Sequence, residues 1–214
     1  MPTPAIKICG ISTPATLDTV IKARADHVGF NFFPPSPRYL SPANAGSLGA
    51  RAAGHLGKVG VFVDADDALL GEAVSAAGLT AIQLHGSESP EQAARVRARF
   101  GLPVWKVISV TDAADIARAQ GYAGAADFIL FDAKTPAGTL PGGMGLRFDW
   151  SLLNGFTGPL PWGLAGGLSP RNVGEAARLT GAGLVDTSSG VESAPGIKDE
   201  GLIAAFCKAV RADA

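Results

Sequence analysis

Three side chains that can transfer protons stand directly after short apolar runs of the sequence: Cys9, Asp64 and Asp132. A thiolate can remove a proton from carbon when nearby positive charge or hydrogen-bond donors lower the pKa of its thiol. A carboxyl group in apolar surroundings suits a general acid near neutral pH. The structural alternatives are an inert buried cysteine and an aspartate that fixes a loop. The sequence barely distinguishes Asp64 from Asp132 for the acid role.

A second set of residues indicates binding of anionic groups. The pairs Gly166-Gly167 and Ser188-Ser189 each follow an apolar run, and glycines let backbone amides approach a ligand closely. A short helix after the serine pair is expected to point its positive end toward the same place. Arg38 closes a loop stiffened by prolines, and its planar head suits a carboxylate or a phosphate. The alternatives are glycines that serve only tight turns and an arginine paired with a surface acid.

The other candidates for chemistry are few. His85 follows a further apolar run, where it either lines a site or fixes a loop, whereas His27 and His55 fall at the start of a strand and in a loop. Cys207 is expected in the core, on the last helix. Metal-ligand spacing, a dinucleotide-binding glycine motif and a Gly-x-Ser-x-Gly elbow are all missing from the sequence. We therefore expect no metal and no cofactor.

Apolar runs alternate with segments of helical periodicity along the whole chain. Runs that are apolar throughout indicate strands buried on both faces, and their alternation with helices indicates a parallel sheet. The predicted strands are Ala5–Cys9, His27–Phe32, Lys58–Val63, Ala81–Leu84, Val104–Ser109, Asp127–Phe131, Pro161–Ala165 and Leu184–Thr187. The predicted helices are Pro14–Arg24, Pro42–Ala53, Asp66–Ala77, Pro90–Phe100, Asp112–Gln120, Phe148–Asn154, Arg171–Thr180 and Asp199–Ala212.

Eight such units predict a single-domain (β/α)8 TIM barrel over residues 1–214, with an open doubly wound sheet as the competing α/β architecture. Four helices are expected to begin at a hydroxyl residue followed by proline, because the hydroxyl caps the first turn and proline lacks only an N–H that would be unpaired there. These starts are Thr13-Pro14, Ser41-Pro42, Ser89-Pro90 and Ser169-Pro170. The stretch Thr135–Gly145 is interpreted as one long functional loop. In a barrel, chemistry belongs at the carboxyl ends of the strands, where most of the candidate residues fall.

Composition narrows the possible partners. Of the 214 residues, 47% are hydrophobic and 17% are charged, with a formal net charge of −1 and no block of like charges. Neither nucleic acid nor an anionic membrane is therefore the expected partner. The two cysteines do not make a disulfide framework, and no apolar run approaches the roughly 18 residues of a membrane span. The expectation is a cytoplasmic monomer that binds a small molecule.

Taken together, these segments resemble the phosphoribosylanthranilate isomerase family of tryptophan biosynthesis over nearly the whole chain. Each motif is weak alone, but their order and spacing are specific. In the first half the motifs are Lys7-Ile8-Cys9-Gly10, Gly29-Phe30-Asn31-Phe32, Ser36-Pro37-Arg38-Tyr39, Val59-Gly60-Val61-Phe62-Val63 and Ile82-Gln83-Leu84-His85-Gly86. In the second half they are Leu130-Phe131-Asp132, Phe148-Asp149-Trp150, Leu164-Ala165-Gly166-Gly167-Leu168 and Asp186-Thr187-Ser188-Ser189-Gly190-Val191-Glu192, followed by Pro195-Gly196-x-Lys198-Asp199.

The resemblance implies a cofactor-free Amadori rearrangement of N-(5-phosphoribosyl)anthranilate to 1-(2-carboxyphenylamino)-1-deoxyribulose 5-phosphate. It implies that Cys9 is the general base and Asp132 the general acid. Arg38 would hold the anthranilate carboxylate. The other implied substrate-binding residues are Gln83, His85 and Asp186, with Gly166, Gly167, Ser188 and Ser189 around the phosphate.

One motif departs from the family pattern, which usually has Gly-Gly-Thr-Gly where this chain has Gly142-Gly143-Met144-Gly145. This change puts a side-chain contact there in doubt, whereas a backbone contact would survive. The insert Lys134–Pro141 is also longer than the shortest loops of the family.

Three other functions stay open at this point. One is the sister isomerase of histidine biosynthesis or a dual-substrate enzyme, although that family has aspartate at the position of Cys9. Another is a Schiff-base aldolase that uses Lys106 or Lys134. The third is a phosphate-binding barrel without turnover.

Overall fold

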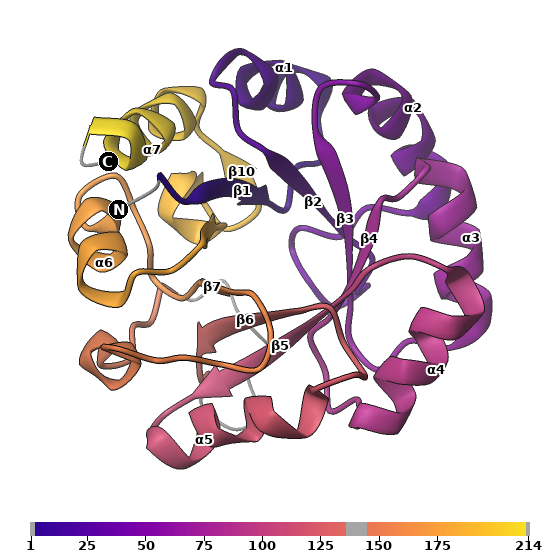
Figure 1. Ribbon diagram of the computed structural model, residues 1–214. Coiled ribbons are helices and arrows are strands. Elements are labelled where there is room, and N and C mark those ends of the chain that lie inside the picture. Colours follow the sequence, from indigo (N-terminus) through magenta and orange to yellow (C-terminus); the bar gives the residue numbers. More distant parts are fainter. Residues whose placement is uncertain (1–2, 136–144, 213–214) are drawn as a thin grey trace.

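The computed structural model describes residues 3–135 and 145–212, and eight parallel strands in this part of the chain close into a barrel. Neighbouring strands pair in sequence order, and the first strand pairs with the eighth, so the predicted barrel is confirmed and the open sheet is wrong. Figure 1 shows the ring of strands with helices around it. The strands are β1 (Ala5–Cys9), β2 (His27–Asn31), β3 (Gly57–Phe62), β4 (Ala81–Leu84), β5 (Val104–Val110), β6 (Phe128–Ala133), β7 (Trp162–Leu164) and β8 (Leu184–Thr187).

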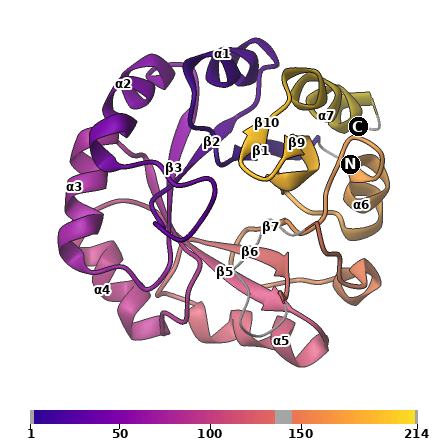
Figure 2. The ribbon, with the colours of Figure 1, turned by 180° about the vertical axis from the view of Figure 1, so that it is seen from behind.

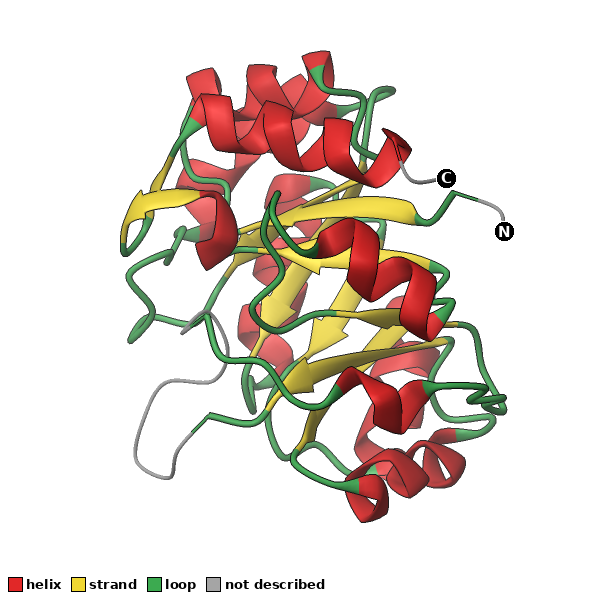
Figure 3. Cartoon of the chain, turned by 90° about the vertical axis from the view of Figure 1, so that its left-hand side faces the viewer, coloured by secondary structure: helices red, strands yellow, loops and turns green. Residues whose placement is uncertain are grey.

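Helices connect most of the strands and enclose the barrel, as Figure 3 shows from the side. Among the described residues, no helix is long and apolar enough to cross a membrane. The α-helices are α1 (Pro14–Lys22), α2 (Pro42–Ala52), α3 (Asp67–Ala77), α4 (Pro90–Phe100), α5 (Ala113–Ala117), α6 (Val173–Thr180) and α7 (Glu200–Ala212). A small antiparallel pair, β9 (Glu192–Ala194) and β10 (Ile197–Lys198), lies between β8 and α7. Figure 2 shows this pair from the opposite end of the barrel.

Three of the four predicted hydroxyl–proline helix starts are present. Thr13, Ser41 and Ser89 each accept a hydrogen bond from a backbone amide in the first turn of their helix. The fourth prediction is wrong, because α6 begins only at Val173. Ser169 instead donates its backbone N–H to the side chain of Asn172, which makes a loop of the intervening residues.

The structure corrects two further predicted helices. The segment Phe148–Asn154 contains only the 3-10 helix η2 (Trp150–Leu153), and the short helix expected after Ser188-Ser189 is the three-residue 3-10 helix η3 (Ser189–Val191). The fifth connection divides into α5 and a 3-10 helix, η1 (Arg118–Tyr122). An α-helical N-terminus is therefore not the source of any anion binding after β8.

The two faces of each strand are buried in different cores, as the period of two residues in a strand requires. On β6, Ile129 and Phe131 pack outward against the helices, whereas Leu130 belongs to a second cluster inside the barrel. The inner cluster consists of Val59, Ala81, Trp105, Val107, Leu130, Ala165 and Leu184. Two residues after Leu130 the next inward side chain of β6 lies at the carboxyl end of the barrel, where the candidate site is.

Candidate active site

One pocket at the carboxyl ends of the strands receives all ten residues predicted for the site. Arg38 lies on the loop after β2 and His85 on the loop after β4, and the others come from strands β1, β4, β6 and β8 and from the loops after β7 and β8. The pocket is lined by the predicted Cys9, Arg38, Gln83, His85, Asp132, Gly166, Gly167, Asp186, Ser188 and Ser189 and, in addition, by Asn31, Ser36, Val61, Ala165, Leu168 and Thr187. The predicted convergence of these residues is thus what the fold produces.

Cys9 lies on the inner face of β1, beside a buried ion pair. Lys7, two residues earlier on the same strand, is fully buried, and its Nζ lies 2.9 Å from Oδ2 of Asp186 on β8. Oδ1 of Asp186 is buried and has no hydrogen-bond partner. Burial raises the pKa of the Cys9 thiol above its ordinary value, although the charge of Lys7 opposes that rise. Lys7 therefore supplies the nearby positive charge that favours a thiolate, but burial outweighs it.

Asp132 ends the inner face of β6 and is held in place from two sides. Its Oδ1 accepts a hydrogen bond of 2.8 Å from the backbone N–H of Ala133, and its Oδ2 lies 3.4 Å from Nε2 of His85. Gly166 packs directly on this carboxylate with a φ of +84°, and a Cβ there would lie 2.9 Å from Oδ1 of Asp132 and 2.5 Å from the Ala133 nitrogen. Only glycine fits at position 166, because any side chain would displace the end of β6.

Asp64, the competing candidate for the acid, has a structural role. Its Oδ1 accepts hydrogen bonds from the backbone N–H and the hydroxyl of Ser87, and its backbone adopts a φ of +47°. Its own N–H donates to Glu88, which forms a buried ion pair with Lys106 at 2.6 Å. The Nζ of Lys106 also donates to the carbonyl group of Leu84 at the end of β4 and to that of Gly86 in the following loop. This cluster fixes the loop that begins with His85.

Arg38 binds a carboxylate that the sequence analysis did not single out. Its Nε and Nη2 donate to the two carboxylate oxygens of Glu192 at 2.8 and 2.7 Å. Lys198 of β10 donates to the same carboxylate at 2.7 Å and also to the backbone and hydroxyl oxygens of Ser188. Burial alone would raise the pKa of Glu192, but the hydrogen bond from Arg38 and the charge of Lys198 hold it below its usual range.

The residues predicted around a phosphate lie on two adjacent loops. Gly167, like Gly166, has a positive φ, and the hydroxyl of Ser188 donates to the backbone oxygen of Cys9 at 3.2 Å. The Ser188–Cys9 hydrogen bond ties the loop after β8 to the end of β1. Of the motif Gly142-Gly143-Met144-Gly145 and the insert Lys134–Pro141, residues 136–144 lie outside the described residues.

Among the described residues, the pocket contains buried hydrogen-bond acceptors rather than a cluster of metal ligands. In the part of the chain that the structure describes, no group of three or more His, Cys, Asp or Glu side chains could hold a metal ion. Two pocket atoms are buried without a hydrogen-bond partner, namely Oε1 of Gln83 and Oδ1 of Asp186. Because an unpaired buried acceptor is costly, both atoms are suited to receive hydroxyl or amine donors of a ligand.

The sequence matches the family model described as N-(5'-phosphoribosyl)anthranilate (PRA) isomerase over residues 6–209. The chain belongs to this family. It is 54% identical to the N-(5'-phosphoribosyl)anthranilate isomerase of Paramagnetospirillum magneticum, with 96% of each chain covered. Membership of this isomerase family makes the chain an enzyme and confirms the resemblance predicted from its motifs.

Solved structures of the phosphoribosylanthranilate isomerase family have the same fold. The crystal structure of the enzyme from Thermotoga maritima superimposes with a TM-score of 0.88 at 36% sequence identity and covers 98% of this chain and 99% of its own. A second family structure, in complex with reduced 1-(o-carboxyphenylamino)-1-deoxyribulose 5-phosphate, gives a TM-score of 0.85 at 33% identity, with 98% and 99% covered. A second Thermotoga maritima structure, of monomers generated from a dimeric isomerase, gives a TM-score of 0.84 at 35% identity, with 98% and 99% covered.

Proposed function

We propose that this enzyme converts N-(5-phosphoribosyl)anthranilate to 1-(2-carboxyphenylamino)-1-deoxyribulose 5-phosphate in tryptophan biosynthesis, with Cys9 as general base and Asp132 as general acid. The observation that carries the proposal is that a thiol and a carboxyl group, from β1 and β6, line one pocket in a member of this isomerase family. The assignment of individual residues rests on this geometry and on the motifs of the chain.

The chemistry begins with opening of the furanose ring. Asp132 donates its proton to the ring oxygen, the bond between that oxygen and C1′ breaks, and the nitrogen lone pair forms an iminium. The carboxyl group is well placed for this step because His85 and the Ala133 amide fix its orientation. A positioned acid or base of this kind typically contributes about 10²–10⁴-fold to the rate.

The second step moves a proton from carbon. The Cys9 thiolate takes the proton from C2′, and the electron pair of that C–H bond forms the double bond of an enolamine, which neutralises the iminium. Loss of the proton on the C2′ oxygen and addition of a proton at C1′ then give the aminoketose. No electrons are gained or lost overall, and the iminium is itself the electron sink. The proposal therefore needs no metal and no other cofactor.

Two proposed anion sites would position C2′. Arg38 is proposed to hold the anthranilate carboxylate, and the amides around Gly166, Gly167, Ser188 and Ser189 to hold the phosphate. Binding of both anionic groups of the substrate uses binding energy to orient the reacting carbon. Gln83 and Asp186 would accept hydrogen bonds from the sugar hydroxyls or the amine, because each has a buried acceptor without a partner.

We extend the proposal to a single catalytic domain over residues 1–214 that works as a monomer in the cytoplasm. The small-molecule substrate is supported by the family structure with a bound product analogue. Sedimentation of the purified protein at micromolar concentration tests the monomer.

The deciding experiment follows the fluorescence of freshly generated phosphoribosylanthranilate as purified enzyme consumes it. Wild-type protein should consume it equally with and without a metal chelator. Cys9→Ser and Asp132→Asn should be inactive, whereas Cys207→Ala, which removes the other thiol of the chain, should turn over normally. Wild-type protein without turnover, or activity abolished by the chelator, would contradict the proposal.

A further inference from the structure

We propose that Lys7 is a positioning residue of this enzyme, whose buried ammonium group stabilises the thiolate form of Cys9. The inference rests on the proposed role of Cys9 as the base. It concerns a residue that does not line the pocket and that meets the proposed substrate-binding residues only through its ion pair with Asp186.

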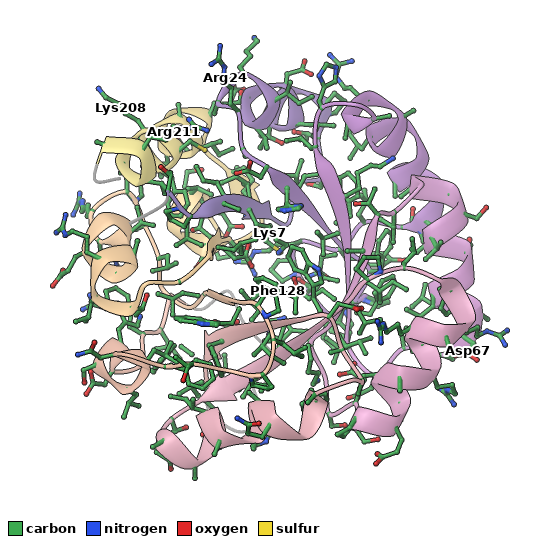
Figure 4. The ribbon with its side chains drawn as sticks, viewed as in Figure 1. Lys7, Arg24, Asp67, Phe128, Lys208 and Arg211 are labelled. Atoms are coloured by element: carbon green, nitrogen blue, oxygen red, sulfur yellow. The ribbon has the colours of Figure 1, made fainter. Side chains whose placement is uncertain are left out.

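The fold places the Lys7 ammonium beneath the thiol. Lys7 and Cys9 occupy alternate positions of β1, so both side chains point into the barrel, and the two residues lie about 7 Å apart along the strand. Figure 4 shows Lys7 at the centre of the ring of strands. The side chain of Lys7 is fully buried, and its Nζ meets the carboxylate of Asp186, its register partner on β8, at 2.9 Å.

Charged groups from several elements surround the thiol, and Lys7 is the strongest cation among them. After burial, which raises the pKa of Cys9, the largest effect is the charge of Lys7, which lowers it. Asp186 raises the Cys9 pKa, and Lys198, which donates to Glu192 and Ser188, lowers it by less than Lys7 does. The charged and titratable groups that line the pocket together with Cys9 are Asp186 on β8, His85 after β4, Asp132 on β6 and Arg38 after β2. Lys7 on β1 and Lys198 on β10 act on the thiol without lining the pocket.

The alternative is a buried ion pair that only ties β1 to β8. Such pairs are weak evidence of stabilisation, since desolvation of both charges offsets their attraction. The molecule contains a matched case in Lys106 and Glu88, which are also buried and lie 2.6 Å apart on the opposite side of the barrel. Lys106 is not among the groups with the largest effects on the pKa of Cys9. A Lys106 variant therefore serves as the control: it shows the effect of losing a buried lysine that is not beside the thiol.

The test is the pH dependence of Cys9 alkylation by iodoacetamide, measured in a Cys207→Ala background so that one thiol reacts. Lys7→Met should raise the apparent thiol pKa by at least about one unit, which lowers the alkylation rate near neutral pH about tenfold. Lys106→Met should leave the rate unchanged, and Lys7→Arg should restore most of it. The basic shift of the acidic limb of the kcat/KM profile should match the shift in alkylation.

A second variant keeps the test decisive if Lys7→Met does not fold. Asp186→Asn removes the anion beside the thiol while Lys7 stays, so the thiol pKa should fall and alkylation should accelerate. If Lys7→Met folds and leaves the thiol pKa unchanged, the role of Lys7 is overturned, even if Cys9→Ser is inactive. If Lys7→Met does not fold, an unchanged thiol pKa in Asp186→Asn overturns it. Conversely, an active Cys9→Ser enzyme would remove the proposed base, and the alkylation titration would still report whether Lys7 acts on the thiol.

Discussion

Replacing Glu192 by glutamine tests the buried charge cluster that fixes Arg38. Glu192 accepts hydrogen bonds from Arg38 at 2.8 and 2.7 Å and from Lys198 at 2.7 Å, and the three side chains are at most 10% exposed. Glutamine keeps the shape of the side chain but leaves two buried cations without their shared counter-ion. Removing one partner of a buried ion pair costs about 3–5 kcal/mol. We use the lower end, about 3 kcal/mol, because the amide oxygen still accepts one hydrogen bond.

This loss predicts a measurable fall in thermal stability. In a domain of this size 1 kcal/mol corresponds to about 2–4 °C, so Glu192→Gln should lower the melting temperature by about 6–12 °C at pH 7. The matched control is Asp18→Asn, which breaks a two-bond pair with Arg51 on the exposed surface. Its melting temperature should barely change, because solvent screens the exposed pair.

The effect should also depend on pH in a defined direction. The folded-state pKa of Glu192 lies below its ordinary value, so the stability from its charge is fully present above the unfolded pKa of about 4.3. That stability is lost as the pH falls through the lower folded pKa. The difference in unfolding free energy between wild type and Glu192→Gln, from urea titrations, should be constant near neutral pH and narrow below about pH 4.3. Equal stability of the two proteins at pH 7 would refute the reasoning.

Cys9→Ser and Asp132→Asn should each lower kcat/KM by at least about 10²-fold while thermal melts and product titration stay near wild type; near-normal turnover by a folded Cys9→Ser protein would return Cys9 to an inert core residue. Arg38→Ala should raise KM more than it lowers kcat if the guanidinium binds the carboxylate equally in substrate and transition state, and an unchanged KM would remove that assignment. Gly166→Ala should lower the melting temperature, because the backbone φ of +84° alone costs about 1–3 kcal/mol for a residue with a side chain. Stability unchanged in that variant would show that the loop after β7 tolerates a Cβ.

Much of the site could be predicted from the sequence because strands impose a period of two. In β1 and β6 alternate residues, Ile6 and Ile8 or Ile129 and Phe131, lie in the outer core. The residue that follows each of these segments therefore points inward and lines the pocket. This alternation brings Cys9 and Asp132 to one edge of the barrel without any knowledge of their contacts. Proline and a hydroxyl residue likewise marked the starts of three helices, since capping is a local interaction.

Tertiary structure alone decided which charged groups meet. Asp64 and Asp132 both follow buried strands, and only the hydrogen bonds from Ser87 to Asp64 separate a loop-fixing carboxylate from one that lines the pocket. Glu192 and Arg38 are 154 positions apart, so no local spacing indicates that they pair. The environment of Cys9 was also undetermined, because burial and the charge of Lys7 act on it through the closed barrel. Spacing along the chain specifies which edge of the sheet a side chain reaches, whereas its partners and its pKa depend on neighbours that only folding brings into contact.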